Sequence, residues 1–492
     1  MTRLLLLAIV LLSLSCNTPP PKPSFSPEYF FEQLEKLKDK FQIPGLAAAV
    51  VEDGKIIGQR YFGYADLDPQ IPVDSTTLFP IASITKVYSA VLLLKLVEQG
   101  RLSLDDPISP YFTDIKLPDS LKIGHILSHT SQGAVGQHFY YSPRFSVLTR
   151  IIEQASGQAF STLMDKEIFE PLALRNSLLL QDSAQLGDRL ARLARPYEMT
   201  EEGIREGPVE WGYSASAGIA ATLSDLVAFS NALDGQVLLS RRTKEILFSP
   251  PKADLPYGHG IFSQDFAGER LLWAYGQYDG YSSLLLKLPA KDLSLVLLAN
   301  NNLMSDPARL IYGDVYYSLF ALAFLDTYSQ ALFPVPQGDV IAITIEQAKT
   351  ISLLSRQKLL AEALADSFLA RFDTTKLRSS ERLLQEAFAK NPDLMDHAGL
   401  SLLHNFSFLK TVAFHSEMGD FNTFDVQLEM LGNQLLDEDP DNPYAHFYLG
   451  EYHAGKGNTE VARTHFEHIV NAPNFSKQWY TKEAEEWLQQ NK

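Results

Sequence analysis

The sequence has a single cysteine among its 492 residues. One cysteine cannot form a disulfide framework within the chain, nor a zinc site built from several cysteines. Basic residues are also few, since 42 Lys and Arg face 59 Asp and Glu, for a formal net charge of −17. This charge disfavours attraction to phosphate backbones, so nucleic acid is not an expected partner. We also find no internal apolar run of the roughly 18 residues that a membrane span requires.

The N-terminal residues have the pattern of an export signal. Arg3 precedes an apolar run over residues 4–12, and small or polar residues then lead to Cys16. This order is typical of a secretory signal peptide. With Cys16 at the cleavage position and prolines after it, the segment resembles a bacterial lipoprotein signal. We therefore expect residues 1–16 to be signal, residues 17–27 to be a Pro-rich spacer, and the protein to be a periplasmic or cell-envelope lipoprotein anchored through Cys16. An ordinary signal peptide is the alternative.

Residues 28–330 have the pattern of an α/β (α+β) domain. Helical spacing over residues 28–40 precedes two strand-like runs, 46–51 and 56–62, which flank the hairpin dipeptide Asp53-Gly54. Further strand-like runs lie late in the sequence, at 271–273, 282–288 and 293–299. If these strands join the first hairpin, an antiparallel sheet forms with helices around it.

Residues 335–492 lose the strand pattern and follow helical spacing instead. Asn442 begins one expected helix, Gly457-Asn458 makes a turn, and Ala462 and Phe466 lie four residues apart on a second helix. These offsets are tetratricopeptide-like, because small residues let two helices cross closely and large ones fill the gap. A generic helical bundle is the alternative. Such a tail could bind a protein partner.

Ser83 and Lys86 are the candidate catalytic pair. Serine and lysine three apart on a helix share a face, where the amine can reach the hydroxyl. The spacing recurs at Ser249/Lys252, Ser355/Lys358 and Ser407/Lys410, so context must decide. Ser83 precedes the apolar run 91–97, which predicts a buried helix. At the start of such a helix backbone N–H groups are free, and burial lowers the pKa of a lysine so that it can act as a base.

Around this pair the chain resembles a known superfamily. The ordered matches are Pro44-Gly45-Leu46-Ala47-Ala48-Ala49-Val50-Val51, Gly63-Tyr64-Ala65-Asp66-Leu67, Ile81-Ala82-Ser83-Ile84-Thr85-Lys86, residues 96–107 and residues 123–131. Over residues 28–325 the chain is similar to serine beta-lactamases and penicillin-binding proteins, in the branch of class C enzymes, D-Ala-D-Ala carboxypeptidases and esterases. The resemblance implies a beta-lactamase/transpeptidase-like fold, Ser83 as the acylated nucleophile, Lys86 as its proton acceptor, and no metal or other cofactor.

The family's second motif, Tyr-x-Asn before a helix, falls on Tyr140-Tyr141-Ser142. The resemblance implies that its tyrosine relays a proton to the leaving group and that Ser142, in place of asparagine, faces the substrate. We place the catalytic tyrosine at Tyr140. A register shifted by one residue would place it at Tyr141.

The third motif, a cation followed two residues later by glycine, falls on Ala274, Tyr275 and Gly276 as substrate-binding positions. The resemblance also implies an oxyanion hole from the backbone N–H groups of Ser83 and Gln277. Ala274 cannot carry the charge that binds a substrate carboxylate in the family. An esterase or specialised peptidase is therefore easier to reconcile with the sequence than a true beta-lactamase.

Two histidines, His125 and His129, have a spacing compatible with metal ligands, but no glutamate completes H-E-x-x-H. We expect them to be structural. The sequence thus predicts an exported serine hydrolase that acts on a small-molecule or peptide ester or amide. The alternative is a catalytically degenerate penicillin-binding-protein-like scaffold that binds a partner through its helical tail.

Overall fold

The structure is a computed structural model that describes residues 25–332, 345–416, 421–472 and 478–491. Residues 1–16, Cys16 among them, and most of the 17–27 spacer lie outside the described residues, so the export signal and the lipid anchor stay predictions. Within the described ranges, no helix is both long and apolar enough to cross a membrane.

One antiparallel sheet organises the N-terminal domain. Its strand order is β3-β2-β1-β12-β11-β10-β9. The strands are β1 Gly45–Glu52, β2 Lys55–Asp66, β3 Ile71–Pro72, β9 Phe262–Phe266, β10 Glu269–Tyr278, β11 Tyr281–Leu288 and β12 Leu293–Ala299. The hairpin at Asp53-Gly54 is confirmed, because Glu52 pairs with Lys55. The closure of the late strands onto the first hairpin is also confirmed, because β12 pairs with β1.

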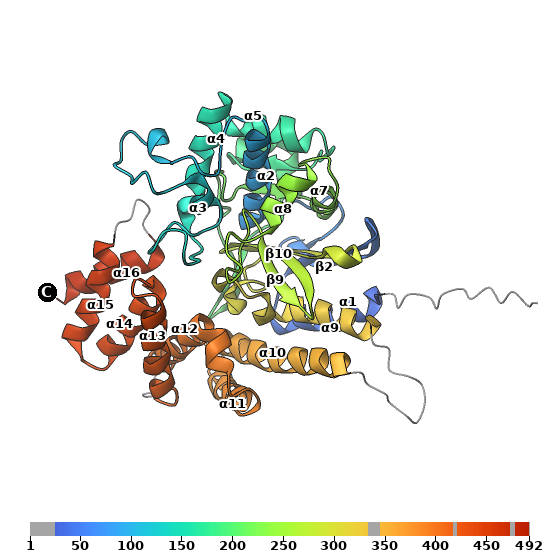
Figure 1. Ribbon diagram of the computed structural model, residues 1–492. Helices are drawn as coiled ribbons and strands as arrows, with labels where there is room; N and C mark the ends of the chain where they lie inside the picture. The colour runs from blue at the N-terminus through green and yellow to red at the C-terminus, as the bar shows by residue number, and fades with distance from the viewer. Residues whose placement is uncertain (1–24, 333–344, 417–420, 473–477, 492) are drawn as a thin grey trace, which may run out of the picture.

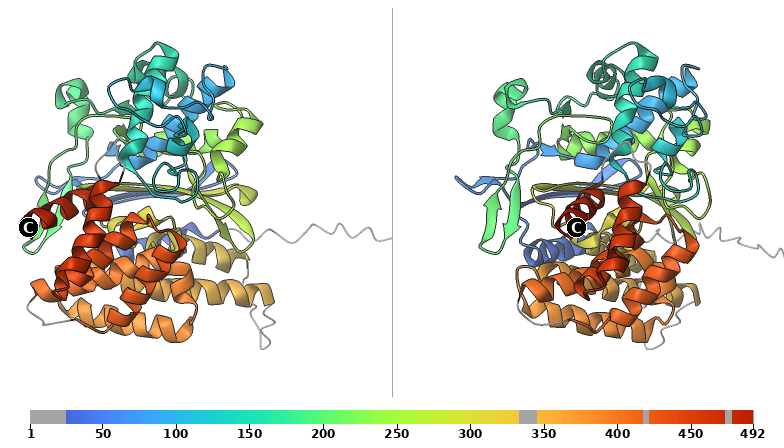
Figure 2. Two further views of the ribbon diagram at one scale, coloured as in Figure 1. Left: turned by 60° about the vertical axis from the view of Figure 1, so that its left-hand side comes forward. Right: turned by 90° about the vertical axis from the view of Figure 1, so that its left-hand side faces the viewer.

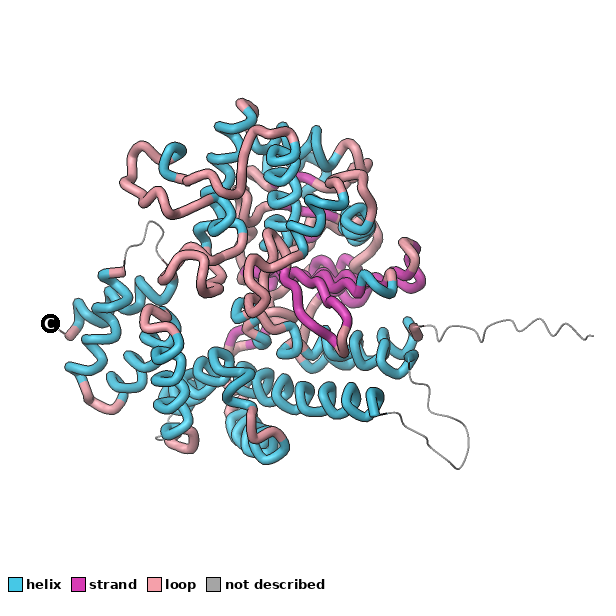
Figure 3. The backbone as a smooth tube through the Cα atoms, in the orientation of Figure 1, coloured by secondary structure: helices cyan, strands magenta, loops and turns pink. Residues whose placement is uncertain are grey.

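Helices cover both faces of this sheet (Figures 1 and 3). One face carries α2 Thr85–Glu98, α4 Leu148–Ser156, α7 Leu223–Asp234 and the shorter helices α3 Ile123–Leu127, α5 Phe160–Met164, α6 Ser183–Leu186 and α8 Arg241–Phe248. The other face carries α1 Pro27–Lys40 and α9 Leu319–Leu332. Short strands complete the domain: β4 Phe79–Pro80, β5 Leu178–Leu179, β6 Tyr197–Thr200, β7 Gly203–Glu206 and β8 Ile219–Ala221. Alternate strand residues therefore enter two separate apolar cores.

The C-terminal tail is all helical, as predicted. Its helices are α10 Ile345–Leu369, α11 Thr375–Lys390, α12 Leu394–His415, α13 Asp425–Glu438, α14 Pro443–Gly455, α15 Thr459–Asn471 and α16 Trp479–Gln490. Asn442 caps α14 by accepting the N–H groups of Tyr444 and Ala445. A side chain at Gly450 would meet the ring of Phe466 at 2.7 Å, so this glycine permits the close crossing of α14 and α15. The assignment to tetratricopeptide repeats stays a prediction.

The tail packs on the N-terminal domain rather than standing apart from it. Helix α10 packs against α9 on the face of the sheet that carries α1 and α9. Helices α14 to α16, red in Figure 2, lie beside the N-terminal domain. The hydroxyls of Tyr312 and Tyr448 join the two parts by a 2.8 Å hydrogen bond.

Candidate active site

Ser83 lies in a single 3₁₀ turn, Ala82–Ile84, that leads directly into α2. The preceding residue, Ala82, has a φ of 44°, which a non-glycine residue rarely adopts and which costs conformational energy. Such strain is common at sites where the backbone must present one side chain. As the spacing predicts, Lys86 Nζ lies 2.8 Å from Ser83 Oγ. Ser83 is partly exposed, whereas only 4% of Lys86 is exposed.

Burial of Lys86 makes its amine a base near neutral pH. Lys86 lies on α2, most of whose residues are buried, and desolvation lowers its pKa from 10.5 to about 7. The amine also donates a 3.1 Å hydrogen bond to the carbonyl of Ser216, which fixes its direction. At neutral pH a substantial fraction of Lys86 is therefore uncharged and can accept the Ser83 proton.

Two of the other Ser/Lys pairs at this spacing engage different partners. Ser249 Oγ bonds to Glu245, and Ser407 Oγ bonds to Glu451. Lys410 forms an ion pair with Asp425. Context, rather than spacing alone, distinguishes the Ser83/Lys86 pair from the others.

The structure corrects the choice of catalytic tyrosine. Tyr141, not Tyr140, faces the pair: its ring centre lies 4.9 Å from Lys86 Nζ, and its hydroxyl is close enough to Ser83 for the serine to influence the tyrosine pKa. Burial raises the pKa of Tyr141 and the interaction with Ser83 lowers it, with burial the larger effect, so the phenol stays protonated at neutral pH. Tyr140 points the other way and bonds to Asp439 of the tail. Neighbouring side chains of an extended segment point to opposite sides, so the shifted register holds.

His129 packs against Tyr141 and binds the backbone of the residue that follows it. Its ring stacks on Tyr141 with centroids 4.4 Å apart, and its Nδ1 accepts the N–H of Ser142 at 3.0 Å. Burial and the nearby Lys86 hold the pKa of His129 well below 6.5, so the ring is neutral. His125 has a local role, accepting the N–H of Lys122 at the start of α3. Within the described ranges, no group of three or more His, Cys, Asp and Glu residues could hold a metal ion.

Strand β10 passes beside the 3₁₀ turn that holds Ser83. A side chain at Gly276 would lie 2.1 Å from the carbonyl oxygen of Ile81, so only glycine allows this approach. Strand β9 pairs with β10 only as far as Trp273, which leaves Gln277 in a stretch that β9 does not cover. Gln277 is partly exposed there. An oxyanion hole from its N–H and that of Ser83 is compatible with this position and stays a prediction.

Three of the expected substrate-binding side chains are buried. Ser142 is 2% exposed, and its hydroxyl caps the next turn by accepting the N–H of Arg144. Tyr275 is 3% exposed and packs in the core beneath the sheet, because it points opposite to Ala274. Ala274 is 5% exposed and supplies only a methyl group. Sequence reasoning also missed the Ser216 carbonyl, for which no local pattern gave a signal.

The structure has an antiparallel sheet between helical layers and, at the start of α2, a serine whose hydroxyl contacts a buried lysine. This combination defines the beta-lactamase and penicillin-binding-protein class of fold. The Beta-lactamase family model matches residues 31–317, more than half of the chain. The protein therefore belongs to the Beta-lactamase family.

Curated relatives are distant. The chain is 25% identical to a D-aminopeptidase of Gluconobacter oxydans over 306 residues, covering 54% of this chain and 57% of that one. It is 23% identical to Protein flp of Staphylococcus aureus over 305 residues, covering 54% and 61%. The chain thus spans about three fifths of the length of these relatives.

Solved structures agree on the fold. A penicillin-binding protein homologue from Pyrococcus abyssi, described as octameric, superposes with a TM-score of 0.55 at 22% identity, covering 68% of this chain and 81% of that one. A penicillin binding protein from Bacillus halodurans gives 0.50 at 21% identity, covering 55% and 95%. At these identities the likeness concerns the fold alone.

The first prediction concerns pH. Because Lys86 must be uncharged to accept a proton, the rate of Ser83 acylation should rise with pH and level off above its pKa of about 7. The rate of labelling by a fluorophosphonate, corrected for hydrolysis of the reagent, measures this profile. A midpoint near the ordinary lysine pKa of about 10.4 would contradict the assignment of Lys86 as a buried base.

The second prediction separates the two tyrosines. Tyr141→Phe should lower the acylation rate by about 100-fold or more, because it removes a proton relay at the reacting atoms. Tyr140→Phe, the matched change one residue away, should cost no more than about tenfold, because Tyr140 does not reach Ser83. Steady-state and labelling rates of both variants test this order, and the reverse order would restore the original register.

Proposed function

We propose that the protein is a serine hydrolase that works through an acyl-enzyme on Ser83. The observation that carries this proposal is the 2.8 Å contact between the Ser83 hydroxyl and a buried lysine whose pKa is about 7. In the first half-reaction the Ser83 proton passes to uncharged Lys86 while Oγ attacks the substrate carbonyl carbon. The Tyr141 hydroxyl, which lies beside Ser83, gives its proton to the leaving ester oxygen or amide nitrogen as the bond to the acyl carbon breaks. Tyr141 then takes the proton held by Lys86, so that Lys86 is uncharged again in the acyl-enzyme.

In the second half-reaction water attacks the acyl carbonyl and releases the acid. Lys86 accepts a proton from this water, and the proton returns to Ser83 Oγ as the ester bond breaks. Backbone N–H groups of Ser83 and Gln277 would stabilise the oxyanion in both steps. Every step uses only groups of this chain, the substrate and water.

We propose that the substrate is an ester or amide whose reacting portion carries no free carboxylate. Ala274 stands where the family has a cation for that carboxylate, and it is a buried methyl group. The similarity to a D-aminopeptidase supports aminoacyl esters and amides, including those of D-amino acids, as the class to examine. Beta-lactams and peptides ending in D-Ala-D-Ala carry the carboxylate and should react less well.

The third prediction tests reaction and substrate together. A fluorophosphonate should label Ser83, as peptide mapping would show, with no label in Ser83→Ala and strongly reduced label in Lys86→Ala. The wild type should hydrolyse p-nitrophenyl esters and D-alanine p-nitroanilide. It should cleave a D-Ala-D-Ala peptide with a C-terminal amide at least as fast as the same peptide with a free carboxylate, and turn over nitrocefin slowly.

Labelling elsewhere in the chain would contradict the proposed nucleophile. No labelling and no turnover of any of these substrates would favour the alternative, a degenerate scaffold that binds a partner. A marked preference for the free-carboxylate peptide would overturn the substrate class while leaving the Ser83 mechanism in place.

A further inference from the structure

The residues on either side of Tyr141 are bonded to the helical tail. Tyr140 is 2% exposed, and its hydroxyl donates a hydrogen bond to Asp439, which follows α13. Ser142 Oγ accepts a 3.0 Å hydrogen bond from Gln478, which precedes α16. Asp439 and Gln478 are each 5% exposed. Both bonds are therefore shielded from water, where breaking one leaves a polar group without a partner.

The same two residues are also held from inside the N-terminal domain. The N–H of Tyr140 donates to the carbonyl of His129 at 2.9 Å, and the N–H of Ser142 donates to His129 Nδ1 at 3.0 Å. Each neighbour of Tyr141 thus has its backbone fixed by His129 and its side chain fixed by the tail. Because the segment is extended, this arrangement points Tyr141 in the opposite direction, towards Ser83.

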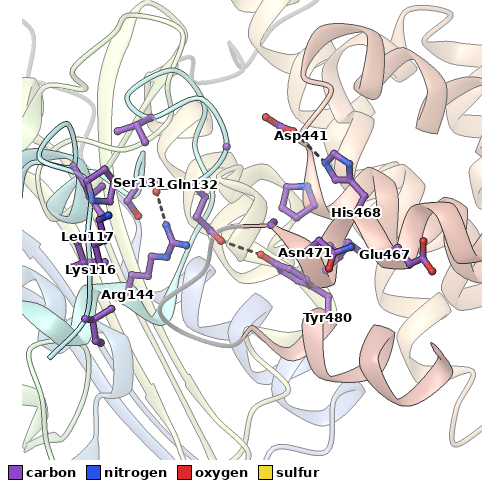
Figure 4. Close-up of a pocket in the computed structure, with 18 of the residues that line it drawn as sticks. Lys116, Leu117, Ser131, Gln132, Arg144, Asp441, Glu467, His468, Asn471 and Tyr480 are labelled. Carbon is purple, nitrogen blue, oxygen red and sulfur yellow. Dashed lines mark hydrogen bonds and ion pairs between the residues drawn. The ribbon is translucent and has the colours of Figure 1, made fainter. Parts of the chain in front are cut away.

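A third contact ties the preceding loop to the tail. The Tyr480 hydroxyl donates to Gln132 Oε1 at 3.1 Å across the junction of the two parts (Figure 4). A cavity of about 930 Å³ opens beside this contact, between the loop and α15, and neither Ser83 nor Tyr141 lines it. The Gln132 contact and the cavity are therefore separate from the Ser83 and Tyr141 side chains.

We infer that the helical tail is part of the active site, with Asp439 and Gln478 as positioning residues for Tyr141. The inference rests on the proposed hydrolase function. A relay group must be held within roughly 0.5 Å of its working position. The Tyr140 and Ser142 bonds to the tail restrict the two backbone positions that set the direction of the Tyr141 ring. The tail is thereby a support for proton transfer and not only a module for binding a partner.

The fourth prediction is made on the full chain. Gln478→Ala should lower kcat on a p-nitrophenyl ester about tenfold, with KM changed less than about twofold, because a displaced relay affects the chemical step more than binding. The pH midpoint near 7 should not move, because Lys86 keeps its surroundings. Gln478→Glu should restore much of kcat, since the Ser142 hydroxyl can donate as well as accept.

Two controls distinguish positioning from a general loss of docking. Tyr448→Phe removes the hydrogen bond to Tyr312 between tail and domain without touching the Tyr141 loop, and should keep kcat within about twofold. In a Tyr141→Phe background, Gln478→Ala should have almost no further effect on kcat, because its effect passes through the missing hydroxyl. Thermal unfolding of each variant shows whether it folds.

Asp439→Asn, which keeps an acceptor for Tyr140, serves as a second, milder variant expected to retain most of kcat.

The inference would be overturned if Gln478→Ala had the kcat of the wild type. It would also be overturned if Gln478→Ala lowered kcat equally in the wild type and in the Tyr141→Phe background. Neither result would contradict the proposed hydrolase function. A loss of kcat in Gln478→Ala that Gln478→Glu does not restore would also count against the inference. If the wild type itself fails to react at Ser83, the proposed function falls and the inference falls with it.

Discussion

The site depends on one buried amine that is kept from water and bonded to a hydroxyl. A charged lysine at this depth would lose several kcal/mol of hydration, and among the residues that the structure describes its hydrogen bonds go to Ser83 and Ser216 and not to a carboxylate. The uncharged form avoids that cost, and it is the form that can accept a proton. The apolar helix α2, packed between the sheet and the surrounding helices, therefore does more than fill the core. Its burial lowers the pKa of Lys86, and in the proposed mechanism that lowered pKa lets Lys86 take the Ser83 proton.

The second requirement is the direction of Tyr141, and here the chain uses more than the family domain. The family model ends at residue 317, whereas Asp439 and Gln478 belong to the tail. His129 and the tail hold the two neighbours of Tyr141 from opposite sides. This explains how a loop without the family's asparagine can still present a tyrosine at the nucleophile. It also gives the tail a role that helical spacing alone does not suggest.

The sequence predicts correctly those parts of the fold that depend on residues close together in the chain. The Asp53-Gly54 turn is marked by its dipeptide, the helix from residue 27 to 40 by its helical spacing, and the buried helix α2 by a continuous apolar run. The Ser83 and Lys86 contact is equally local, because one helical turn brings the two side chains together. Such features need no knowledge of distant residues.

The errors lie where the pattern carries no period or where the partners are distant. The segment at Tyr140 and Tyr141 is short and extended, so a shift of one residue exchanges the inward and outward side chains. The partners that would have resolved the register, Asp439 and Gln478, lie 299 residues from Tyr140 and 336 residues from Ser142. The substrate-facing role expected of Ser142 follows from the same register, which places it at the asparagine of the family's second motif. Only the folded structure shows that its hydroxyl is already bonded to the tail.

The central claim is that Lys86 loses its proton near neutral pH while it contacts Ser83. An NMR titration of the full chain with ¹³C-labelled lysine measures this directly, and the Lys86→Met variant identifies the signal. The account predicts that the Lys86 ε-carbon titrates with a midpoint near pH 7 in the wild type. A midpoint near 10, as for a solvent-exposed lysine, would contradict it.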